Sequence, residues 1–267
     1  MAPCRLGPEL GRGIVDLDAN LRPASSMRAI VTGYHEDFTP AWSPDGKWIV
    51  YHSHRSPTPV PSYDSEGSTD DIYLRRYSPL SSEEIRLTDF GWEAGSPDWA
   101  PSGREIVFSS WEKGKTPQAG KPWIVTIDPE TGKPLGATRL PLPDQIRTTD
   151  ELAWSPQGNE IAAIEATDDA TRTIWILSTD GRKADKLVEY RSLAYGGLDW
   201  TPDGKTIIYS GLAGDNMQLF SITPPGGLSR QITHDPANLL HPQVSPDGRW
   251  IAGTRVESRK ELWKLKL

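Results

Sequence analysis

The chain has 267 residues and a formal charge of −7, from 29 basic and 36 acidic side chains. This acidic balance argues against nucleic acid as the main partner, because neutralising phosphates needs an excess of Lys and Arg. No apolar run approaches the roughly 20 residues of a membrane-spanning helix, so we expect no membrane insertion. The single cysteine, Cys4, excludes an internal disulfide and a four-thiolate zinc site.

The start of the chain is expected to be a flexible arm, residues 1–12, followed by a single domain over residues 13–267. The arm lacks the apolar stretch of a secretion signal, so either the protein is cytoplasmic or a leader is absent from this form of the sequence. Short strands are expected at residues 14–17 and 28–31, where apolar residues first recur.

Five copies of one motif follow, reading WSPDG, WAPSG, WSPQG, WTPDG and VSPDG. Pro presets the second position of a type I turn, Asp suits the third and Gly the fourth, so each copy predicts a tight hairpin. An isoleucine lies three residues after every motif glycine, with a polar residue two positions before it. This alternation indicates a strand with one buried face after each turn.

A third and a short fourth strand recur after each hairpin. The third is expected at residues 72–74, 123–125, 174–176, 219–221 and 262–264, and the fourth at 86–87, 139–140, 186–187 and 231–232. The last two motif glycines are 44 residues apart, close to the period of about 40–45 residues of a four-stranded propeller blade. The fold class is therefore all-β, a β-propeller with four-stranded blades.

The number of blades has two interpretations. In the first, five blades form a ring that the N-terminal strand near Ile30 closes beside Trp263, which would remove free sheet edges. In the second, a six-bladed ring is incomplete at both ends. The first is slightly favoured.

The pattern apolar-Trp-Ser-Pro-Asp-Gly-basic-x-Ile, followed by Ile-Tyr-Leu and Arg-Leu-Thr, resembles the WD40-like repeat of TolB-type propellers. The resemblance covers Gly13 to Leu267. It implies a monomeric periplasmic or secreted propeller with a protein or peptide partner, as in the Tol envelope machinery. Similar propellers are also domains of serine peptidases and amidohydrolase-type enzymes. The α/β domain of TolB and the hydrolase domain of the peptidases have no counterpart in this sequence.

Catalytic motifs are not recognisable: the sequence contains no Gly-x-Ser-x-Gly elbow, HExxH, P-loop or Gly-x-Gly-x-x-Gly. Catalysis stays open, and a binding or scaffold module with its ligand at the channel mouth or loop face is favoured. The alternatives are a hydrolase or lyase that uses acidic and histidine groups at the channel mouth, and the propeller part of a larger enzyme.

Ionisable side chains gather where the first strand of each blade is expected to enter the channel. Converging carboxylates there suit a divalent cation such as calcium, or a basic peptide end. The alternative is a solvated ring of charges around a water-filled hole. The predicted channel-mouth residues are Glu36, Asp37, Glu93, Asp150, Glu151, Tyr195 and His241.

A metal site is a second hypothesis. His52 and His54, two apart on a strand, point to one face and suit a metal ion, with Asp64, Asp70 and Asp71 expected in the loop that follows. The alternative is two surface histidines beside an insertion.

Two insertions, residues 55–69 and 112–121, are expected to leave the same face of the ring. They serve either as partner contacts or as solvated excursions. Trp92 and Trp111 lie outside the motif and are candidates for a sugar-binding platform.

Overall fold

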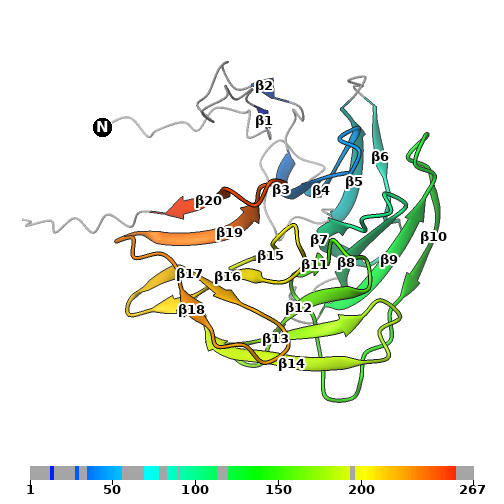
Figure 1. Ribbon diagram of the computed structural model, residues 1–267. Coiled ribbons are helices and arrows are strands. Elements are labelled where there is room, and N and C mark those ends of the chain that lie inside the picture. The colour runs from blue at the N-terminus through cyan, green and yellow to red at the C-terminus, as the bar shows by residue number, and fades with distance from the viewer. Residues whose placement is uncertain are drawn as a thin grey trace, which may run out of the picture. The chain divides into compact units, whose positions relative to one another are not determined.

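The computed structural model describes residues 13–14, 28–29, 35–55, 69–77, 83–89, 91–112, 120–192 and 196–256 (Figure 1). Two compact units divide the chain: residues 1–99 with 103–138, and residues 100–102 with 139–267. Each unit is described by itself. Every regular element among the described residues is a β-strand, which confirms the all-β prediction.

The first unit holds two four-stranded antiparallel sheets and a short strand pair. In each sheet, strands that follow one another along the chain are neighbours. The strand pair is β1 (Gly13–Ile14) with β2 (Arg28–Ala29), and the sheets are β3 (His35–Trp42), β4 (Trp48–Arg55), β5 (Thr69–Arg76) and β6 (Glu84–Arg86), then β7 (Glu93–Trp99), β8 (Glu105–Trp111), β9 (Lys121–Ile127) and β10 (Pro134–Arg139).

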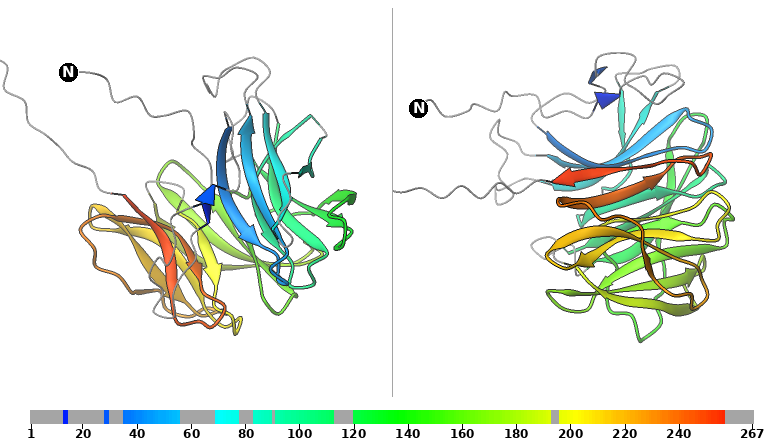
Figure 2. Two further views of the ribbon diagram at one scale, coloured as in Figure 1. Left: turned by 90° about the horizontal axis from the view of Figure 1, so that it is seen from above. Right: turned by 60° about the vertical axis from the view of Figure 1, so that its left-hand side comes forward.

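The second unit also holds two four-stranded sheets, together with one two-stranded sheet. Figure 2 shows its sheets following one another as layers. They are β11 (Leu152–Trp154), β12 (Glu160–Ala166), β13 (Thr171–Ser178) and β14 (Ala184–Arg191), then β15 (Leu198–Trp200), β16 (Ile207–Ala213), β17 (Asn216–Ile222) and β18 (Arg230–Gln231), and finally β19 (Asn238–Val244) with β20 (Ile251–Val256).

The Pro-x-Gly turns form as predicted, each between the first and second strands of its sheet. In the first, Gly46 has φ +69° and its N–H donates to the Ser43 carbonyl at 2.9 Å. The Asp45 carboxylate closes the turn from within, accepting the Ser43 hydroxyl at 2.7 Å and the Lys47 N–H at 3.0 Å. The turns that end at Gly204 and Gly248 carry the same contacts.

The second strands are buried on both faces rather than on one. Four of the five motif isoleucines are buried, as predicted, but so are the residues that follow them, such as Val50 and Val107. One face packs against the neighbouring sheet of the same unit. In β4 the other face, with Ile49 and Tyr51, packs against Tyr73 and Tyr77 of its own blade. Ile251, in the last sheet, is 41% exposed and departs from the predicted burial.

Two of the motif tryptophans join neighbouring sheets of the same unit. Trp99 is 5% exposed and its indole N–H donates to the Ala41 carbonyl of β3 at 3.2 Å. Trp200 does the same to Ala153 of β11 at 3.1 Å. Trp42 was predicted to be core but is 48% exposed, because β3 begins the first four-stranded sheet and no four-stranded sheet precedes it among the described residues.

Ring closure stays a prediction. The described part of the strand near Ile30 is β2, whose Ala29 pairs with Gly13 of β1. Trp263, with which that strand was expected to pair, lies outside the described residues, as do Ile30 and the arm of residues 1–12. The described residues form four four-stranded sheets, which decides neither for five blades nor for an incomplete six.

Candidate functional site

The first strands of the sheets carry an unusual backbone feature close to their entry. The pairing of β3, β7 and β19 with the next strand is interrupted by a bulge. In each bulge a residue other than glycine has a left-handed φ, between +45° and +52°. Each of them precedes a proline, a position that normally favours extended backbone. These residues are Thr39, Ser96 and His241, before Pro40, Pro97 and Pro242.

Gly197 occupies the same place before β15, three residues before its motif tryptophan, with φ +77°. Bulges of this kind redirect side chains and are frequent beside functional sites. A backbone conformation that costs about 1–3 kcal/mol persists only where the surrounding structure fixes it. The repeated bulge therefore marks the entry region of the first strands as the place to look for a site.

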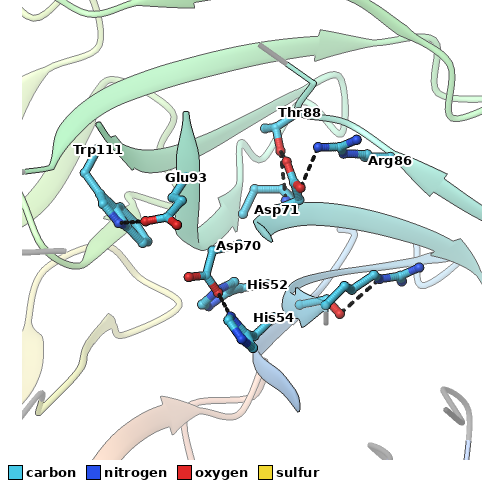
Figure 3. Close-up of polar contacts among 11 residues, drawn as sticks. His52, His54, Asp70, Asp71, Arg86, Thr88, Glu93 and Trp111 are labelled. Atoms are coloured by element: carbon cyan, nitrogen blue, oxygen red, sulfur yellow. Dashed lines mark hydrogen bonds and ion pairs between the residues drawn. The ribbon is translucent and has the colours of Figure 1, made fainter. Parts of the chain in front are cut away.

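In the first unit, two histidines meet one aspartate (Figure 3). The Asp70 Oδ1 atom lies 2.8 Å from His52 Nε2 and 3.0 Å from His54 Nδ1. Burial alone would raise the pKa of Asp70, but hydrogen bonds and charge from the two histidines lower it overall. The prediction that the two histidines point to one face is confirmed, whereas Asp70 and Asp71 lie on β5 and not in a loop.

Side chains of the second sheet complete this cluster. The Trp111 ring meets the His52 imidazole edge-on at 6.5 Å between centroids, and its indole N–H donates to Glu93 Oε2 at 2.8 Å. A Cβ added to Gly95 would lie 3.3 Å from His52 Nδ1. Trp111 is 4% exposed, so it cannot serve as the exposed sugar platform considered above. Trp92 is exposed.

Asp71, the neighbour of Asp70, has a structural role. It accepts the Thr88 hydroxyl at 2.7 Å and an Arg86 N–H at 2.7 Å (Figure 3). A matching contact joins Gln218 and Thr233 in the sheet of β15–β18. Because the same tie between third and fourth strands recurs in another blade, it belongs to the fold and not to a site.

In the second unit, two carboxylates stand side by side before β11. Asp150 is 4% exposed, and burial raises its pKa to about 7, with the charge of Glu151 adding to the effect. Burial also raises the pKa of Glu151 to about 7, although its carboxylate accepts the Gly197 N–H. Groups that titrate near neutrality inside a protein are typical of functional sites, although structural groups can do the same.

Gly197 joins the carboxylates to the next bulge. A Cβ at this position would lie 2.7 Å from the Cα of His241 and 3.3 Å from Glu151 Oε2. The His241 N–H donates to the Gly196 carbonyl at 2.7 Å. Glu151, Gly197 and His241 therefore form one contiguous group at the entry of β11, β15 and β19.

The predicted channel-mouth residues are only in part placed by the structure. Glu93, Asp37 and Glu36 belong to the first unit, and Asp37 is buried. Asp150 and His241 belong to the second unit, where Glu151 and Gly197 link their neighbourhoods. Tyr195, Asp64, Cys4 and most of both insertions lie outside the described residues. The convergence of all these groups on one channel stays a prediction.

Metal binding stays a prediction as well. Within the described ranges, no group of three or more His, Cys, Asp or Glu side chains is arranged to hold a metal ion.

A search of the same ranges finds no helix with the length and hydropathy needed to cross a bilayer.

Sequence reasoning missed the bulges and the partners of the two clusters. The bulge does have a signal, since a proline stands two residues before the motif Trp or Val in three of the five repeats. Asp70 was noticed, but its pairing with His52 and His54 depends on the register of β4 and β5. The contact of Glu151 with Gly197 joins two sheets, and no local sequence pattern predicts it.

The sequence was compared with protein-family models and with known proteins. No protein-family model matches the sequence. Over 212 residues the chain is 24% identical to the uncharacterized peptidase YuxL of Bacillus subtilis, a match that covers 79% of this chain and 28% of the peptidase. The chain thus spans less than a third of that relative.

Two solved structures share the architecture. A TolB from Agrobacterium tumefaciens superposes with a TM-score of 0.63 at 20% identity, covering 87% of this chain and 74% of that one. An oligogalacturonate lyase in complex with manganese gives 0.60 at 15% identity, covering 90% and 67%. Such low identities establish the architecture alone. The chain has the fold of a TolB-like β-propeller with four-stranded blades.

Proposed function

We propose that this propeller is a binding module that takes a protein or peptide where the first strands of its blades begin. The observation that supports this most is the left-handed bulge, repeated in β3, β7 and β19 and set beside ionisable side chains. Strained bulges that keep their conformation in several blades suit a surface that must present groups in a fixed geometry.

The surroundings of the bulges suit recognition. Asp37 and Glu93 stand before the bulges of β3 and β7, and His241 lies within that of β19. Both insertions connect a second strand to a third strand, and those second strands end at Arg55 and Trp111. Long loops beside rigid strands are the usual place for partner contacts. From the resemblance to TolB-type propellers, we also propose a periplasmic or secreted location and a monomeric state.

The test is selection of ligands on the purified protein. Peptides selected from a displayed random library would be synthesised and their dissociation constants measured by calorimetry. We expect at least one peptide to bind, and His241→Asn to weaken it about tenfold, since Asn tolerates the left-handed backbone but removes the imidazole. The matched control is His234→Asn at an exposed position, which should bind as the unchanged protein does. Selection that yields no binder would contradict the proposal.

An enzyme is the second candidate, and two observations favour it. His52 is hydrogen-bonded to Asp70, and the Asp150 and Glu151 carboxyls titrate near pH 7, which is where a general acid or base works best. The fold is shared with a lyase, and part of the sequence with a peptidase. Saturable turnover of oligogalacturonate or of a peptide, lost in His52→Gln, would identify the protein as a lyase or hydrolase instead of a binding module.

A further inference from the structure

The carboxylate of Asp150, in the second unit, is buried without a full set of hydrogen-bond donors. The Asp150 N–H donates to the Ile164 carbonyl at 2.7 Å, which fixes the backbone at this point. The side chain is buried, yet its Oδ1 accepts no hydrogen bond within the described part of the chain. A buried charged oxygen without a partner is costly, and such atoms often await a water, an ion or a ligand.

Glu151 adds a second negative group to the same place. Its carboxylate accepts the Gly197 N–H, which holds the side chain beside β15. Burial raises the pKa of Asp150, and the charge of Glu151 hinders its ionisation further. One hydrogen bond from a backbone N–H does not offset the negative charge of the buried Asp150 together with that of the half-buried Glu151.

The charged and titratable groups around Asp150 and Glu151 do not neutralise the negative charge of the pair. Arg172 on β13 is the cation that acts on both, but its guanidinium is engaged by the carbonyls of Asp168 and Thr171, at 2.7 and 3.1 Å. Tyr190 on β14 feels the charges of both carboxylates, and the backbone of His241 on β19 lies beside Gly197. Even with Arg172 present, both carboxyl pKa values remain near 7, which means that the resident cation is not enough.

We infer that Asp150 and Glu151 together form the seat for an organic cation of the ligand, an ammonium or guanidinium group carried by a Lys or Arg side chain or by a peptide N-terminus. The inference rests on the proposed binding function and names the chemistry of the group that is bound. Such a cation supplies N–H donors to the open Oδ1 atom and charge to both carboxylates. Glu151 lies beside Gly197, which in turn contacts His241, so the seat adjoins the region where the ligand is proposed to lie.

The seat makes binding dependent on pH. A cation needs the carboxylates ionised, and both ionise near pH 7 in the free protein. Affinity should therefore be steady above pH 8 and fall below pH 7, by about tenfold per pH unit for each proton that the cation must displace from the two carboxyl groups.

The experiment uses melting temperatures of the full chain and of Asp150→Asn, with Asp215→Asn as the control at an exposed aspartate. The probes are N-acetyl-arginine amide, N-acetyl-lysine amide, glycine amide with its free amino group, N-acetyl-citrulline amide and calcium chloride, all at pH 8. At least one organic cation should raise the melting temperature of the unchanged protein by about 3 °C at saturation, and citrulline should not. The arginine, lysine and glycine probes distinguish the three sources of the cation.

Asp150→Asn should melt about 2–4 °C higher than the unchanged protein without a probe, since an uncompensated charge is removed, and should no longer respond to the cation. A lower melting temperature without probe would show that the carboxylate has a structural partner and would overturn the inference. So would a response to calcium but to no organic cation, or no response to any probe. If selected peptides bind the protein and Asp150→Asn alike, the binding module stands and the cation seat fails.

Discussion

Two aspartates, the half-buried Asp70 of the first unit and the buried Asp150 of the second, have opposite pKa shifts. Asp70 receives two imidazole nitrogens on one oxygen, and its pKa is lowered. Asp150 receives no donor on Oδ1 among the described residues, and its pKa is raised to about 7. Burial opposes ionisation of both, so the difference comes from the donors and charges that surround each carboxylate.

The contrast separates a group that serves the fold from a group that is ready for a ligand. A carboxylate with its donors in place stabilises the folded state, and replacing it should cost stability. A carboxylate without them destabilises the folded state, and replacing it should add stability at the expense of whatever it binds. Substitutions at the two aspartates should therefore have opposite signs, and this can be measured.

The largest effect is expected from Gly197→Ala, because Gly197 packs against His241 and its N–H donates to Glu151. The new Cβ would lie 2.7 Å from the backbone of His241, at a φ of +77°, so both overpacking and strain apply. We expect a loss of about 3 kcal/mol in the free energy of unfolding, measured by urea titration. Gly46→Ala, with φ +69° and open space around it, should lose only about 1 kcal/mol from strain. Equal losses would argue against close packing at Gly197.

Asp70→Asn should reduce the free energy of unfolding by about 2 kcal/mol at pH 7.5, because two hydrogen bonds lose their charged acceptor. The pKa of Asp70 is lowered in the folded protein, so its contribution is present above the pKa of the unfolded chain and is lost as the pH falls below it. The difference between the two proteins should accordingly shrink toward pH 3. A difference that stays constant with pH would assign the effect to packing.

Asp150→Asn should instead gain about 1–2 kcal/mol above pH 7. The folded pKa is raised to about 7 from 3.8, so the stability of the unchanged protein falls as the pH rises between these values and levels off above them. The gain of the variant should vanish near pH 4, where both proteins carry a neutral group. Chemical denaturation at several pH values measures this, and a gain that persists in acid would contradict the pKa assignment.

Glu93→Gln should have the smallest effect, a loss of less than about 1 kcal/mol, because the amide oxygen can still accept the Trp111 indole N–H. The change removes a charge near His52 without altering the Asp70 contacts. Its unfolding free energy, compared with that of Asp70→Asn, shows how much of the first cluster depends on the single aspartate.

The sequence predicts those parts of the structure that local chemistry determines. The Pro-x-Gly hairpins, and the third and fourth strands of the first four repeats, appear where turn residues and apolar spacing place them. The third strand predicted at residues 262–264 lies outside the described residues. Trp42 and Ile251 depart from the predicted burial, because burial depends on whether a neighbouring sheet covers the residue and not on the motif. The number of blades depends on such contacts between distant segments and cannot be read from spacing.

The candidate site was predictable as a region but not as an arrangement. Asp150, Glu151 and His241 could be expected at strand entries, since they precede the motif by similar distances. Whether a carboxylate there is satisfied depends on groups from other strands, such as Gly197 for Glu151 and the two histidines of β4 for Asp70. Those partners lie between 15 and 50 residues away in the sequence, beyond the reach of turn and periodicity rules.

The turns described above also bear on how the chain folds. In the turn of Asp45, the hydrogen bonds made by Ser43 and by the Asp45 carboxylate join residues no more than five positions apart. Such contacts close with little loss of chain entropy, so each hairpin can form early and independently of the others. Folding can then begin at several of the repeats at once, with slower docking of one hairpin on the next, and no single repeat needs to act as the nucleus.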